Sequence, residues 1–83
     1  NPFNPSTLIR YELPNESSVK LIIYNSLGQV VKELVSEVQQ SGYYEVNFNA
    51  SNLSSGIYFY SISATSTEGS KEFRDVKKLM LLK

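Results

Sequence analysis

The residues that could carry out chemistry are few in this chain. Its 83 residues include no Cys and no His, so the thiol nucleophile, the usual general base and the commonest metal ligands are missing. Ser54-Ser55-Gly56 has no neighbouring base and fits a loop cap better than a nucleophile elbow. The carboxylates fall on predicted turns or outward strand positions, whereas glycosidases need two carboxyls across one cleft. We expect no catalytic activity, no metal site and no cofactor.

Charge and hydropathy narrow the range of partners further. Eight basic and eight acidic residues cancel, so no overall field attracts nucleic acid or an anionic membrane. No apolar run is long enough to cross a bilayer, and we expect no membrane insertion. The basic residues gather at the end, because residues 71–83 hold five of them against two acidic residues. We interpret this segment as a solvated edge strand, with a dedicated docking site as the less favoured alternative.

Aromatic side chains are a second possible binding feature. The chain has six Tyr and four Phe but no Trp, and exposed Tyr rings could stack on sugars. Tyr at alternating strand positions more often packs its ring at the margin of the core and leaves its hydroxyl in water. The pattern therefore favours a structural role over a carbohydrate platform.

The elements that must position these residues are predicted to be strands. Apolar residues recur at every second position within residues 7–13, 19–24, 42–48 and 57–65, which is the period of strands with one face in the core. Gly28 is expected to take the positive φ of a tight hairpin turn. The inward positions give a predicted core of Ile9, Tyr11, Leu21, Ile23, Val46, Phe48, Tyr58, Tyr60 and Ile62.

One segment, residues 29–40, can be read in two ways. Val31, Leu34, Val35 and Val38 lie at helical spacing. A strand over residues 30–37 is preferred to a helix over residues 29–40, because a glycine turn precedes the segment, Ser41-Gly42 follows it, and β-branched Val recurs within it.

Short strands separated by frequent turn signals, with no confident helix, are typical of a two-sheet antiparallel sandwich. We expect residues 1–83 to form one all-β domain, a single Ig-like antiparallel β-sandwich of six to seven short strands, held by packing alone. The chain does not begin with Met, which suggests a piece of a longer polypeptide.

Three stretches resemble a known family: LSSGIYFY at residues 53–60, NPFNPST at residues 1–7 and KLMLLK at residues 78–83. The apolar and turn residues between them fall at the same family spacings. The whole chain resembles the type IX secretion system C-terminal sorting domain of the Por secretion tail family. Phe48 and Leu79 replace the Trp and Met that the family often carries, and both remain apolar.

This resemblance implies an Ig-like domain that ends a larger cargo protein, crosses the periplasm folded and is recognised by the outer-membrane type IX translocon. A sortase-like peptidase then commonly cuts upstream of the domain and joins the cargo to a surface lipopolysaccharide. The implied locations are the periplasm in transit and then the cell surface or the exterior. The candidate recognition residues are Lys77, Lys78, Leu79, Met80, Leu81, Leu82 and Lys83. The motif residues expected to act structurally are Gly28, Leu53, Ser55, Gly56, Tyr58 and Tyr60.

Three other functions fit the same pattern. The first is a structural Ig-like surface module within a longer chain. The second is a subunit of an extracellular fibre that forms homo-oligomers when strands add at exposed sheet edges. The third is a carbohydrate-binding module.

Overall fold

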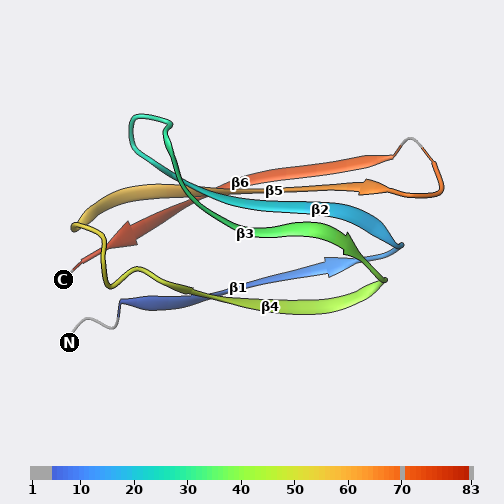
Figure 1. Cartoon of the computed structure of the whole chain (residues 1–83), viewed down its shortest axis with the longest axis horizontal. Helices are drawn as coiled ribbons and strands as arrows, with labels where there is room; N and C mark the ends of the chain where they lie inside the picture. The colour runs from blue at the N-terminus through green and yellow to red at the C-terminus, as the bar shows by residue number, and fades with distance from the viewer. Residues whose placement is uncertain (1–4, 70, 83) are drawn as a thin grey trace.

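The computed structural model describes residues 5–69 and 71–82, and these form six strands and no helix. The predicted strand class and strand number are confirmed. Figure 1 labels the strands in chain order. They are β1 Ser6–Leu13, β2 Ser17–Asn25, β3 Val30–Gln39, β4 Gly42–Asn49, β5 Gly56–Ser66 and β6 Glu72–Leu81.

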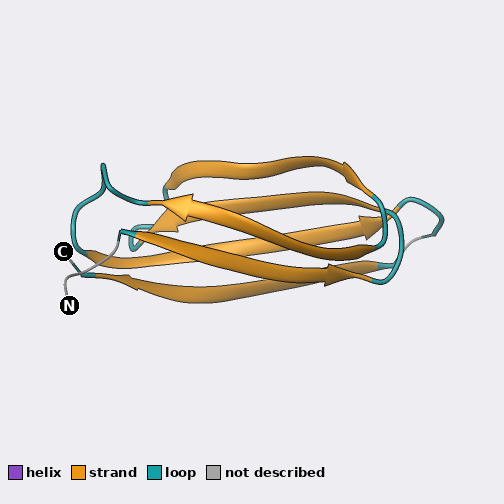
Figure 2. Ribbon diagram, turned by 90° about the horizontal axis from the view of Figure 1, so that it is seen from below, coloured by secondary structure: helices purple, strands orange, loops and turns teal. Residues whose placement is uncertain are grey.

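The strands form two layers. β1 and β4 make a two-stranded sheet, and the other four strands make a sheet of order β3-β2-β5-β6. All neighbouring strands are antiparallel. Figure 2 shows the narrow β1-β4 layer in front of the wider layer. The predicted two-sheet antiparallel sandwich is confirmed, and its unequal layers leave β6 at a sheet edge.

The β2–β3 hairpin explains why residues 30–39 are extended. Gly28 has φ 83°, a conformation that glycine adopts without strain. The side-chain oxygen of Asn25 accepts the backbone N–H groups of Leu27 and Gln29 at 2.9 and 3.0 Å. This turn returns the chain alongside β2, so strand pairing satisfies the backbone of β3 and the helical alternative is excluded.

The core lies between the layers, on the side to which alternate residues point. Val19, Leu21 and Ile23 are fully buried because β2 lies inside the wider sheet. Of the predicted core residues, Tyr11, Val46 and Tyr60 are only partly buried and pack against the core cluster. The remaining six are buried: Ile9, Leu21, Ile23, Phe48, Tyr58 and Ile62.

One carboxylate does not lie where the sequence suggested. Asp75 was expected to point outward, yet it is half-buried and pairs with Ile62, a core residue of β5. Residues paired across an antiparallel ladder point to the same face. Asp75 therefore lies on the inner face of β6, where the smaller sheet leaves this edge strand incompletely covered.

Candidate recognition surface

The candidate recognition residues lie at the end of β6, an edge strand whose partner among the described strands is β5. The register places Lys77 opposite Tyr60, Lys78 opposite Phe59 and Met80 opposite Ile57. Because successive side chains of a strand point to opposite faces, the residues of this segment are divided between the inner and outer faces of the sheet. Lys83 lies outside the described residues.

Two of the candidate residues turn inward. Leu81 is 7% exposed and belongs to the core cluster, and Leu79 is partly buried against that cluster. Their partners across the ladder are Gly56 and the buried Tyr58. The structure therefore gives Leu79 and Leu81 a packing role.

The other described candidates are accessible. Met80 and Leu82 are 61% and 60% exposed, and both lysines are exposed. Lys78 and Met80 lie on the outer face of the wider sheet, whereas Lys77 lies on the inner face beyond the cover of the smaller sheet. We use the name exposed β6 end for Lys77, Lys78, Met80 and Leu82.

Apolar side chains surround Lys78 on that outer face. The ladder places Tyr24 beside Phe59, and Phe59 beside Lys78. A sheet face open to water usually carries mostly polar side chains, so this apolar content is unusual. The outer apolar face consists of Ile22, Tyr24, Ile57, Phe59, Val76 and Met80.

Lys77 shares its face of β6 with Asp75, whereas Lys78 lies among apolar side chains on the other face. β5, their neighbouring strand, contains no Asp, Glu, Lys or Arg. Among the described residues, the ion pair found joins Arg10 and Glu45 on the other sheet, with Nε and Oε2 2.6 Å apart. Lys77 and Lys78 are therefore available to carboxylates of a partner.

The stretch at residues 53–60 makes several contacts within the fold. Gly56 has φ 152°, and the Tyr58 hydroxyl donates a hydrogen bond to the carbonyl oxygen of Ser54 at 2.8 Å. Leu53 packs against the core and its backbone N–H donates to the carbonyl of Ala50 at 2.9 Å. These contacts hold the crossover from β4 to β5.

The tyrosines do not form a row of free rings. The Tyr11 and Tyr44 rings stack on each other, with centroids 5.3 Å apart, and the Tyr11 hydroxyl donates to Oε1 of Gln39 at 2.6 Å. Burial raises the pKa of Tyr11, the hydrogen bond to Gln39 lowers it, and Tyr44 and Glu37 raise it further. Tyr43, at 83% exposed, lies outside the stacked pair but lines the same shallow hollow.

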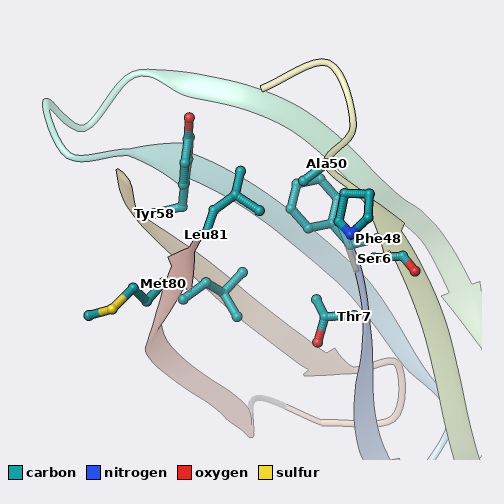
Figure 3. A pocket seen from close by; sticks show the side chains of 9 residues that line it. Ser6, Thr7, Phe48, Ala50, Tyr58, Met80 and Leu81 are labelled. Atoms are coloured by element: carbon teal, nitrogen blue, oxygen red, sulfur yellow. The ribbon is translucent and has the colours of Figure 1, made fainter. Parts of the chain in front are cut away.

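A line of hollows follows the side of the sandwich where β1 lies beside β6. One, of about 230 Å³, lies between the start of β1 and the end of β6. In Figure 3, Leu81 and Tyr58 face Phe48 across this hollow, whereas Met80 points away. A second, of about 150 Å³, lies at the middle of the two strands, and a third, of about 380 Å³, at the far end. We call this open side the β1–β6 seam.

Within residues 5–69 and 71–82 no cluster of three or more potential metal ligands occurs. The same residues include no helix long and apolar enough to cross a membrane. The surfaces open to a partner are the exposed β6 end, the outer apolar face and the β1–β6 seam.

Comparison with protein families decides the identity. Residues 1–76 match the family model described as secretion system C-terminal sorting domain. The chain belongs to this family. Its function is that of a C-terminal sorting signal for type IX secretion, a role that requires no catalysis. Searches of curated proteins and of solved structures found no match.

For this sorting domain, the family match ends at Val76, although the resemblance was expected to extend over the whole chain. The exposed β6 end lies just beyond the matched residues. The proposal that it contacts a partner must therefore stand on its exposure, charge and position at a sheet edge.

Two surface features of the sorting domain were missed by sequence reasoning. The outer apolar face had a signal, because Leu21-Ile22-Ile23-Tyr24 is apolar at consecutive positions, a pattern of strands covered on both faces. The β1–β6 seam had no signal in the sequence, because it forms only when strands from opposite ends of the chain become neighbours.

Proposed function

We propose that the outer-membrane type IX translocon reads this sorting domain through the exposed β6 end. The observation that carries the proposal is the pair Lys77 and Lys78, both exposed and lying beside a strand without charge. A partner surface with carboxylates next to an apolar patch would complement Lys78 and the outer apolar face together.

The remaining steps of the proposal follow the family resemblance. The domain crosses the periplasm folded, behind an upstream cargo, and the cargo reaches the cell surface or the exterior. A sortase-like peptidase cuts upstream of the sorting domain and joins the cargo to a surface lipopolysaccharide. The sorting domain itself supplies only the binding surface.

The test fuses the domain to the C-terminus of a secreted fluorescent reporter in a host with type IX secretion. Lys77→Glu combined with Lys78→Glu should retain the reporter in the periplasm, because the change replaces attraction by repulsion. The matched control is Lys20→Glu with Lys32→Glu, which alters net charge equally at exposed positions on β2 and β3.

Folding must be measured beside export. Exposed charges contribute under about 1 kcal/mol to stability, so both variants should keep the strand-type circular dichroism spectrum and a cooperative unfolding transition. Normal export of the folded Lys77/Lys78 variant would refute the contact at the exposed β6 end. Equal loss in both variants would show dependence on net charge instead.

A further inference from the structure

The β1–β6 seam combines an unpaired sheet edge with an uncovered inner surface. Within residues 5–69 and 71–82, β1 pairs with β4 on one side only, and β6 is the outer strand of the wider sheet. The hollows along the seam are lined from β1 and β6 at both ends and in the middle. One rounded ligand would fill a single hollow, whereas an extended chain could follow all three.

The two strands that border the seam differ in how ready they are to accept another strand. On β6, Oδ1 of Asp75 accepts the backbone N–H of Val76 at 2.9 Å, so this N–H already has an acceptor. Arg74, Lys77 and Lys78 add charges of the kind that protect sheet edges from pairing. For residues 7–13 of β1, the described part of the chain shows no side chain bonded to a backbone N–H. The free edge of β1 is therefore the more receptive one.

We infer that the seam binds an extended segment of a partner protein, which pairs with the free edge of β1 as a third strand of the smaller sheet. Half of its side chains would point inward over β6. There they would cover Phe73, which is 56% exposed, and the half-buried Leu79. β1 is 8 residues long, so the segment would extend over about 27 Å at ~3.4 Å per residue.

Charge defines one further property of the occupant. Lys77 lines the middle hollow together with Asp75 and with Arg10 and Glu12 of β1, and Arg10 is already paired with Glu45. Asp75 already accepts the Val76 N–H, and no ion pair to Lys77 is found among the described residues. The occupant should therefore have apolar side chains at alternate positions and a carboxylate at the inward position beside Lys77.

A second copy of this chain is a poor occupant. The inward residues of its own β1 already pack in its core, so they could not also cover β6 of another copy. Two β6 strands meeting edge to edge would bring their basic residues together. This inference concerns a purified domain and does not depend on export.

The test fuses a designed donor strand to the domain. An eight-residue donor of alternating Val and Thr, with one inward Val replaced by Glu, is fused before residue 1 through a short Gly/Ser linker. Such a tether gives an effective concentration in the millimolar range, so even weak pairing becomes visible. NMR hydrogen exchange should show the β1 amides slowed at least about tenfold relative to the same fusion with a central Pro, which cannot donate to a ladder.

Charge reversal then tests the proposed orientation. The Glu donor should protect β1 about two- to fivefold more than a Lys donor, and Lys77→Glu should invert that order. Lys32→Glu, at an exposed position on β3, is the matched control and should leave the order unchanged.

Three results would overturn the inference. These are no protection of β1 in a folded fusion, protection that appears along β6 instead, and protection in the unfused domain that grows with its concentration. The last would identify a second copy as the occupant.

Discussion

Two adjacent residues near the end of β6 have opposite environments. Leu81 is 7% exposed and packs in the core, whereas Met80 is 61% exposed on the other face. The strand therefore divides its positions between stability and accessibility, one residue at a time. Substitutions at alternating positions should separate folding from binding, which a deletion of the whole segment could not do.

The largest effect is expected for Phe48, which faces Leu81 across the end of the seam (Figure 3). Phe48→Ala should lower the free energy of unfolding by about 3–5 kcal/mol, because it leaves a cavity between the sheets. A loss of this size is a large part of the total free energy of unfolding of a small domain. Urea denaturation followed by circular dichroism gives the value.

Phe59→Ala is the matched control, since Phe59 is half-buried on the outer apolar face. Phe59→Ala should lower the free energy of unfolding clearly less than Phe48→Ala does. A cost below about 1 kcal/mol at Phe48 would mean that the side chain is not packed between the sheets.

The next effect concerns the end of β6 directly. Leu81→Ala should cost about 2–5 kcal/mol, as expected when a buried Leu is truncated. Leu82→Ala, one residue further and 60% exposed, should change stability by less than about 0.5 kcal/mol. Equal losses in urea denaturation would contradict the division into inner and outer positions.

How far sequence could predict this fold depends on the strand. In β1, β2 and β5 the inward residues follow strict alternation, since one face of each is covered along its length, and that alternation alone identifies Ile9, Leu21 and Tyr58 as core residues. In β6 the pattern fails: Phe73 and Val76 are 56% and 58% exposed. An edge strand that is only partly covered has little requirement for an apolar face.

The candidate site was predictable only in part. Position and charge pointed to residues 77–83, but exposure within that segment is set by register with β5, which places Leu79 opposite the buried Tyr58. The seam requires β1 and β6 to lie side by side. Local periodicity carries no information on such a long-range arrangement.

Two tyrosines of the smaller sheet also differ in burial, as Leu81 and Met80 do on β6. Tyr11 packs inward with its hydroxyl bonded to Gln39, and Tyr43 is 83% exposed. Tyr11→Phe should cost about 0.5–1.5 kcal/mol at neutral pH by removing that hydrogen bond. Tyr43→Phe should have no measurable effect on the free energy of unfolding.

Alkaline pH should reduce the difference between Tyr11→Phe and the parent. Burial raises the pKa of Tyr11 above its ordinary value of 10.0 in the folded state, so the unfolded chain loses this proton first. The stability due to neutral Tyr11 is fully present below about pH 10 and is lost as pH rises through the folded-state pKa. Urea denaturation of both proteins across this range would show the gap closing; a gap that widens would mean that ionised Tyr11 is stabilised in the fold.

The smallest effect on stability is expected at Met80, the outer partner of the opening comparison. Met80→Ser should change the free energy of unfolding by less than about 0.5 kcal/mol, because the side chain is exposed on the outer apolar face. Export of a fused reporter should nevertheless fall, since apolar contact beside Lys78 is lost. Leu8→Ser, at a side chain that is 50% exposed on β1, is the matched control and should be exported normally. If Met80→Ser and Leu8→Ser are exported equally well, the outer apolar face does not take part in recognition, and the charges of Lys77 and Lys78 must account for it alone.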